Sequence, residues 1–216
     1  MKKLAITTAA ALTALAAFCA WGGWVYEGQW GTYGPGDGQF QKPSGVVVGA
    51  DGTAYVCDRE NFRIQYFTAN GSFLGKWGTF GSGDGEFRSP RGIAVAPGSG
   101  YVYVVDDAIS CVQYFTRAGS FLGRWGSLGS GNGEFRSPDR PAIAADGKVY
   151  VSDYYNYRVQ YFTSTGSYLG QWGSRGSGDG EFFFPNGLAV NAGGNVYVGE
   201  EGNNRIQYFT AAGSFL

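Results

Sequence analysis

Short apolar runs separated by glycine-containing turns recur along almost the whole chain. In one unit, an apolar run at 93–95 is followed by an alternating Tyr/Val run at 101–105, a run that ends at Phe115, and a last run at 121–125. Runs of this length bounded by turn residues are typical of β-strands, and no segment shows helical spacing over a useful length. The pattern predicts units of four short strands.

Two short sequence motifs show that these units are repeats. The motifs Gly-x-Trp-Gly and Gln-Tyr-Phe each recur at intervals of 47 or 48 residues. The first contains Trp30, Trp77, Trp125 and Trp172, and the second begins at Gln65, Gln113, Gln160 and Gln207. Four strands in a period of this length are the signature of a β-propeller blade. We therefore predict an all-β propeller of four-stranded antiparallel blades, with blades at approximately 40–78, 87–126, 135–173 and 182–216.

The way the propeller closes is left open by the sequence. The last unit stops before its expected Gly-x-Trp-Gly strand, and a segment with that motif lies at residues 24–31. If this N-terminal strand completes the last blade, a closed four-bladed ring results. The alternative is an open arc or a fragment of a larger propeller, whose exposed blade faces would favour self-association.

The sequence pattern of these units resembles the NHL repeat. It has Pro-x-Gly, an apolar run, Val-Tyr-Val, an acidic residue and then Asn-x-Arg-Ile-Gln, here at 185–190 and 196–207. The resemblance extends over all four units and implies an NHL-type β-propeller. NHL-like propellers include enzymes, extracellular sensor domains and RNA-binding domains, and they more often resemble six-bladed rings.

The N-terminus has the pattern of a secretory signal peptide. Lys2 and Lys3 precede an uncharged stretch from Leu4 to Val25, and Cys19 lies before a plausible cleavage site at Ala20. We expect residues 1–20 to be a leader and 21–216 to be the propeller, in a secreted, periplasmic or cell-surface protein. An uncleaved anchor or lipidation at Cys19 are the alternatives that would give membrane attachment.

Composition excludes several kinds of chemistry. The chain has no histidine, which removes Ser-His-Asp triads, Cys-His pairs and His-ligated zinc or haem. The net charge is −1, or −3 without Lys2 and Lys3, so nothing global indicates nucleic-acid binding. Cys57 and Cys111 fall at different places in the repeat, and we expect two buried thiols rather than a disulfide framework.

The acidic residue at the end of each second strand is a candidate site residue. We expect it to pair across the turn with an Arg, as construction repeated in every blade, in the pairs Asp58–Arg63, Asp153–Arg158 and Glu200–Arg205. The second unit differs, since Ile109 and Cys111 stand where Asn and Arg would be. An unpaired acidic pair, Asp106 and Asp107, is therefore a candidate for binding a cation or a sugar hydroxyl, against the alternative of a solvated turn.

One face of the propeller is the candidate binding surface. Starts of first strands and ends of second strands lie on the same side of an antiparallel meander, so the connecting loops share one face. That face is expected to carry five cations: Lys42, Arg88, Arg91, Arg136 and Arg140. They would suit phosphate, an acidic glycan or an acidic protein patch, whereas ordinary solubilising charge is the plainer interpretation.

These observations favour an exported, non-catalytic binding or scaffold protein that recognises a protein or glycan ligand. We expect no catalytic residues, no cofactor and no metal site, because the GSGDGEF loops lack the spaced carboxylates that calcium requires. The first alternative is a propeller hydrolase or lyase that uses a carboxylate-bound divalent cation. The second is an RNA-binding NHL domain, which the charge and the leader both disfavour.

Overall fold

A computed structural model of the chain describes residues 28–216, of which Gly31–Leu216 form one unit. The predicted leader at 1–20, Cys19, and the first part of the predicted N-terminal strand at 24–31 lie outside the described residues. Gly28–Gly31 are described and form no strand. Among residues 28–216, no helix is long and apolar enough to cross a membrane.

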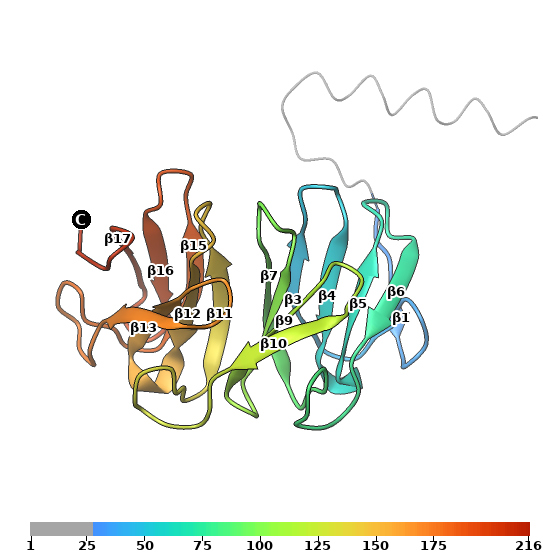
Figure 1. Cartoon of the computed structure of the whole chain (residues 1–216), viewed down its shortest axis with the longest axis horizontal. Coiled ribbons are helices and arrows are strands. Elements are labelled where there is room, and N and C mark those ends of the chain that lie inside the picture. Colours follow the sequence, from blue (N-terminus) through green and yellow to red (C-terminus); the bar gives the residue numbers. More distant parts are fainter. Residues whose placement is uncertain (1–27) are drawn as a thin grey trace, which may run out of the picture. The chain divides into compact units, whose positions relative to one another are not determined.

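Four antiparallel sheets follow one another along the chain, as predicted (Figure 1). Blade 1 consists of β3 (Pro43–Val48), β4 (Ala54–Asp58), β5 (Arg63–Phe67) and β6 (Phe73–Trp77). Blade 2 consists of β7 (Pro90–Val95), β8 (Val102–Asp106), β9 (Cys111–Phe115) and β10 (Phe121–Trp125). Blade 3 consists of β11 (Pro138–Ile143), β12 (Val149–Asp153), β13 (Arg158–Phe162) and β14 (Tyr168–Trp172). Blade 4 has three described strands, β15 (Pro185–Val190), β16 (Val196–Glu200) and β17 (Arg205–Phe209).

The sequence explains why each blade forms a meander. Proline begins every first strand, a place where its missing N–H costs no ladder hydrogen bond. Glycines with positive φ, such as Gly71 (85°) and Gly119 (88°), close the turns between third and fourth strands. The second strand is apolar at nearly every position because both of its faces are covered by neighbouring blades, and β8 and β12 are buried throughout.

The blades are stacked face to face around a common axis. Each first strand packs against the first strand of the next blade, β3 against β7, β7 against β11, and β11 against β15. Aromatic rings fill the seams between blades, since the Trp of each fourth strand lies against the Phe that ends the third strand of the next blade. The ring centroids are 5.5 Å apart for Trp77–Phe115, 5.5 Å for Trp125–Phe162 and 5.6 Å for Trp172–Phe209.

The first and last blades stand at opposite ends of this stack in Figure 1. Within the part of the chain that the structure describes, no comparable packing joins β15–β17 to β3–β6. Exposed apolar side chains mark both ends: Val46 and Val48 on blade 1 are 67% and 62% exposed, and Ile206 on blade 4 is 73% exposed. The described blades therefore form an arc whose two end faces are partly uncovered, since Ala54, Val56 and Phe67 on blade 1 are buried while Val46 and Val48 are exposed.

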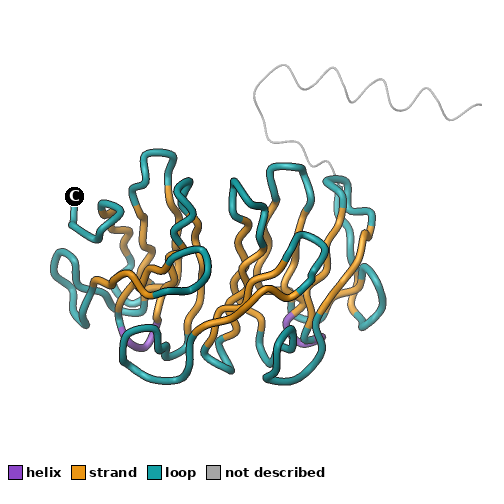
Figure 2. Tube along the Cα trace, in the orientation of Figure 1, coloured by secondary structure: helices purple, strands orange, loops and turns teal. Residues whose placement is uncertain are grey.

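The loops that connect blades are also repeated. The first contains a short parallel pair, β1 (Thr32–Tyr33) with β2 (Gln39–Phe40), and parallel bridges recur at Phe80–Phe87, Leu128–Phe135 and Arg175–Phe182. Two short 3-10 turns, η2 (Arg59–Asn61) and η3 (Tyr154–Asn156), follow the second strands of blades 1 and 3. Figure 2 shows both turns at the same edge of the stack. This edge, with its loops and strand starts, is called the loop face below.

Candidate functional site

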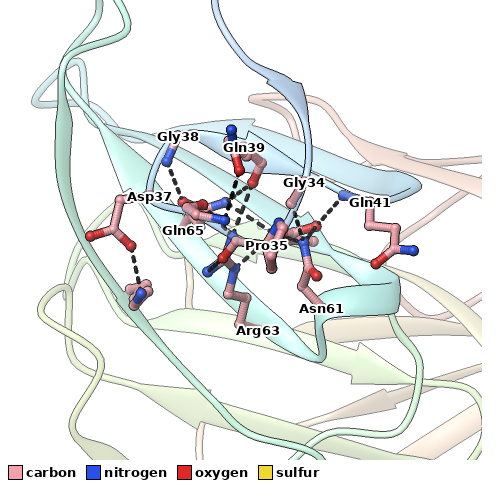
Figure 3. A network of polar contacts seen from close by, with 12 residues as sticks. Gly34, Pro35, Asp37, Gly38, Gln39, Gln41, Asn61, Arg63 and Gln65 are labelled. Atoms are coloured by element: carbon pink, nitrogen blue, oxygen red, sulfur yellow. Dashed lines mark hydrogen bonds and ion pairs between the residues drawn. The ribbon is translucent and has the colours of Figure 1, made fainter.

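In blades 1, 3 and 4, a polar network ties the blade to the loop that precedes it. In blade 1 the buried Asp58 accepts hydrogen bonds from Asn61 Nδ2 at 2.9 Å, from Arg63 Nε at 2.8 Å and from Gln65 Nε2 at 3.0 Å. Arg63 continues to the loop, donating from Nη1 to the Pro35 carbonyl at 2.8 Å. Figure 3 shows Asn61, Arg63 and Gln65 directed together at the loop. The network satisfies loop carbonyls that would otherwise be buried without donors.

Blades 3 and 4 contain the same network. Arg158 Nε lies 2.8 Å from Asp153 Oδ2, and Arg205 Nε lies 2.6 Å from Glu200 Oε1. Asn156 and Asn203 add hydrogen bonds to the same carboxylates. The acidic side chains are fully buried, so they hold loops in place and are not accessible to a ligand, whereas the Arg205 side chain is 28% exposed.

Blade 2 does not have this network, and the expected role of Asp106 is corrected here. Asp106 is 0% exposed, so it is neither a solvated turn residue nor accessible to a cation or sugar. Its carboxylate accepts four backbone N–H groups instead, from Arg88, Ser89, Ala108 and Ile109. Burial raises the pKa of Asp106, and these N–H donors only partly oppose that rise.

Asp107, which was expected to be unpaired, forms ion pairs with two arginines. Its Oδ2 lies 3.2 Å from Arg91 Nη1 and 3.6 Å from Arg59 Nη2. Arg91 Nε in turn lies 3.1 Å from Oδ1 of the buried Asp139. Burial raises the pKa of Asp139, while Arg91 and Arg140 act in the opposite direction.

Arg140 reaches the axis because it stands where the repeat has glycine. Blades 1, 2 and 4 have Gly45, Gly92 and Gly187 at this place, two residues after the strand's first proline. Arg140 Nη1 donates to the Ser44 carbonyl at 3.3 Å and to the Arg91 carbonyl at 3.4 Å, so blade 3 contacts blades 1 and 2. The sequence predicted that Arg140 lies on the loop face, but it did not predict that the side chain contacts blades 1 and 2.

One accessible part of the loop face is a groove between blades 1 and 2. It encloses about 510 Å³ and is lined by Gln41, Lys42, Arg59, Glu60, Phe62, Arg88 and Ser89. Three cations therefore face one acid, and Glu60 is paired with Lys42. We call this space the cationic groove. Of its cations, Arg59 was not predicted from the sequence, because the residue type at this position of the shared turn differs in every blade.

Arg88 is held in the groove by aromatic rings. Its guanidinium carbon lies 5.8 Å from the centroid of the Phe80 ring, and Phe80 packs edge-on against Phe62 with centroids 4.9 Å apart. An arginine stacked in this way loses less side-chain freedom when it binds an anion. Arg136 lies at the equivalent place before blade 3, where it is exposed and its backbone N–H donates to Asp153 at 2.7 Å.

Metal and thiol chemistry have little support in the described residues. Within residues 28–216, no three Asp, Glu, Cys or His side chains gather at metal-binding distance. Cys57 and Cys111 are both buried as free thiols. Burial raises the pKa of Cys111 to about 12, which keeps it protonated at neutral pH.

Two family models match the chain. Residues 40–67 match the NHL repeat, and residues 141–216 match a family described as a 6-bladed beta-propeller. Among curated proteins, a B-box type zinc finger protein, ncl-1, of Caenorhabditis elegans is 43% identical over 49 residues, and so is the protein brain tumor of Drosophila melanogaster. The match covers 23% of this chain but only 6% and 5% of those proteins.

Solved structures share the fold at low sequence identity. Virginiamycin B lyase from Staphylococcus aureus is 17% identical with a TM-score of 0.61, over 81% of this chain and 54% of the lyase. Hydrazine synthase of Kuenenia stuttgartiensis is 13% identical with a TM-score of 0.64, over 90% of this chain and 51% of that one. This chain thus spans about half the length of these structures, and the likeness concerns the fold.

Proposed function

We propose that this chain, whose fold is a β-propeller and whose residues 40–67 match the NHL repeat, is a non-catalytic binding protein whose loop face recognises carboxylate-rich segments of a protein or glycan ligand. The observation that supports this most is the cationic groove. Lys42, Arg59 and Arg88 line it on a protein whose net charge is negative. A local positive surface on an acidic protein attracts anionic partners and disfavours unrelated ones.

The groove has the parts that a carboxylate site needs. Arg88 is exposed and oriented by Phe80, and the Lys42 side chain is 73% exposed although it pairs with Glu60, so a large ligand can reach both cations. Arg59 is fixed by its Nε hydrogen bond to Ser89 Oγ at 2.7 Å. A guanidinium that is already fixed matches a carboxylate with two parallel hydrogen bonds.

The arrangement favours binding over catalysis. A histidine-to-alanine variant of the structurally similar virginiamycin B lyase is described as catalytically inactive, and this chain has no histidine at all. Asp107 and Asp139 both form ion pairs with Arg91, and this positive charge disfavours a divalent cation at the same carboxylates. We include export in the proposal because of the leader-like sequence at residues 1–20.

Titration of a charge-reversed groove tests this function. We expect the wild-type chain to bind a glutamate-rich peptide or a uronic-acid oligosaccharide, with affinity that falls as salt rises. Arg88→Glu should weaken binding about tenfold or more, since it turns an attraction into a repulsion. The matched control is Lys148→Glu, which lies in the turn between β11 and β12 at the edge opposite the loop face.

The control and the choice of ligand make the outcome decisive. Equal losses for Arg88→Glu and Lys148→Glu would show that only overall charge matters, which contradicts a groove site. Binding of single-stranded RNA with no binding of either carboxylate ligand would favour the RNA-binding alternative. Turnover of a lactone or macrocycle by the purified chain would contradict the non-catalytic assignment.

A further inference from the structure

The three seams between blades share one hydrogen bond. The Tyr in the second strand of each blade donates its hydroxyl to a backbone carbonyl in the third-to-fourth strand turn of the next blade. The donor–acceptor distances are 3.3 Å for Tyr55 to Arg117, 2.9 Å for Tyr103 to Ser164 and 2.9 Å for Tyr150 to Ala211. These tyrosines are at most 1% exposed, so every seam closes over the same residue type.

Blade 4 presents the same surface, which no other blade of residues 28–216 covers. Tyr197 occupies the place of those tyrosines and is 36% exposed. Ile206 occupies the place of Ile64, Val112 and Val159, which are 0% exposed, yet Ile206 is 73% exposed. A contiguous apolar surface of this kind is unusual on an isolated soluble protein and marks a site of association. We call it the tail face.

Blade 1 presents the complementary surface at the other end. Ile93 of blade 2 is 7% exposed because it packs into the seam with blade 1. Val46 is at the same place in blade 1 and is 67% exposed, and Val48 behind it is 62% exposed. Ala54 and Val56, on the second strand at the same side, are buried, so the exposed part lies on the inner strand. We call this surface around Val46 and Val48 the head face. One chain therefore carries both halves of a seam, separated at its two ends.

The inner strand of blade 4 also has room for a neighbour. A Cβ on Gly45 would lie 2.7 Å from the Arg91 carbonyl of blade 2, and a Cβ on Gly92 would lie 2.1 Å from the Asp139 carbonyl of blade 3. Glycine is thus required at these seams because the next blade comes so close. Gly187 is the equivalent residue of blade 4, and the nearest atom to its Cβ position is 3.6 Å away, in Gly199 of the same blade.

Charges at the rim of the two faces are complementary. The residue after each second strand contacts its counterpart in the next blade at two seams, Arg59 with Asp107 at 3.6 Å and Tyr154 with Glu201 at 3.1 Å. Continuing this series past blade 4 places the exposed Glu201 beside an Arg59. Opposite charges at this position favour a head-to-tail register over tail-to-tail contact, which would bring two Glu201 side chains together.

We propose that the tail face of one copy binds the head face of a second copy of this chain, and repeats the internal seam between molecules. Tyr197 then donates to the carbonyl of the second copy's Ala69, the residue equivalent to Arg117, Ser164 and Ala211. Gly187 admits the first strand of the second copy. Two copies together bring eight blades, within the range of blade numbers that propellers use.

Sedimentation of the full chain and single-charge variants tests the proposal. We expect the wild type to sediment as a dimer in the micromolar range. Ile206→Lys on the tail face and Val46→Lys on the head face should each weaken association by about tenfold or more, because a lysine would be buried without a partner. The matched control is Leu128→Lys, since Leu128 is also 73% exposed but lies on a connecting loop.

Mixing the two variants identifies the register. An equimolar mixture of Ile206→Lys and Val46→Lys retains one intact tail face and one intact head face, so it should form a one-to-one dimer that neither variant forms alone. Circular dichroism and thermal melting verify that both variants are folded. A monomeric wild type, an unaffected Val46→Lys variant, or a mixture that stays monomeric would each overturn the proposal.

Discussion

Blades 2 and 4 bury the same acidic position with different donors. In blade 4, Glu200 is opposite Arg205 in the strand register and accepts from Arg205, Asn203 and Gln207 side chains. In blade 2, Asp106 is opposite Cys111, and its donors are backbone N–H groups. The two solutions differ in charge, because only blade 4 supplies a cation to its buried carboxylate.

The backbone changes to make the second solution possible. In blades 1, 3 and 4 the residue before the first-strand proline has positive φ, at Lys42, Ser137 and Phe184. Ser89 of blade 2 does not, and its N–H donates to Asp106 at 3.0 Å. A buried carboxylate without an arginine is therefore tolerated when the loop turns additional N–H groups toward it. Every blade thus keeps a buried acidic residue at this position, whereas the groups that donate hydrogen bonds to it differ between blades.

The largest expected effect comes from removing a guanidinium from the arginine-based network. Arg158→Ala should lower the free energy of unfolding by about 3–5 kcal/mol, because Asp153 would remain buried without its cation and loop carbonyls would lose donors. Urea denaturation measures this loss. Cys111→Ala is the matched control at the equivalent place in blade 2, and an equal cost for both variants would contradict the difference between the blades.

A smaller, pH-dependent loss is expected in blade 4. Burial raises the pKa of Glu200, but hydrogen bonds from Arg205, Phe183 N–H, Asn203 and Gln207 together outweigh it and lower the pKa below 4.5. The ionised carboxylate thus stabilises the fold above pH 4.5, and this contribution is lost as pH falls through the folded-state pKa. Glu200→Gln should cost about 1–3 kcal/mol at neutral pH, with a gap to wild type that closes in acid.

The smallest expected effect has the opposite pH dependence. Burial raises the pKa of Asp106 above 3.8, so its contribution to stability is fully present below pH 3.8 and is lost as pH rises through the raised pKa. Asp106→Asn cannot titrate, and its gap to wild type should be largest in acid and shrink toward neutral pH, with a size of about 1 kcal/mol. Denaturation at several pH values measures both variants, and parallel profiles would contradict the assigned donors.

The sequence predicted the blades because their construction depends on spacing. Trp77, Trp125 and Trp172 return at intervals of 48 and 47 residues, and each one closes a seam. Strand ends were set by glycine and proline, whose conformational limits are local. These features act over a few residues, so a single sequence is enough to identify them.

The features of the candidate site that the sequence did not predict depend on contacts between blades. Arg140 occupies a glycine position, and only the placement of three blades shows that it reaches Ser44 across the axis. The donors to Asp106 are backbone groups, which no side-chain pattern encodes. The cationic groove likewise depends on how Arg59 and Arg88, far apart in sequence, meet between two sheets.

The tryptophans of the seams also give the protein internal optical sensors. The indole Nε1 atoms of Trp77, Trp125 and Trp172 are buried without a hydrogen-bond acceptor among the described residues. An indole in such dry surroundings emits at shorter wavelength than one in water, and solvent entry would shift its emission to the red. Each of these rings lies between two successive blades, so fluorescence from a chain in which one of them is the single tryptophan left of the six would report the opening of a single seam.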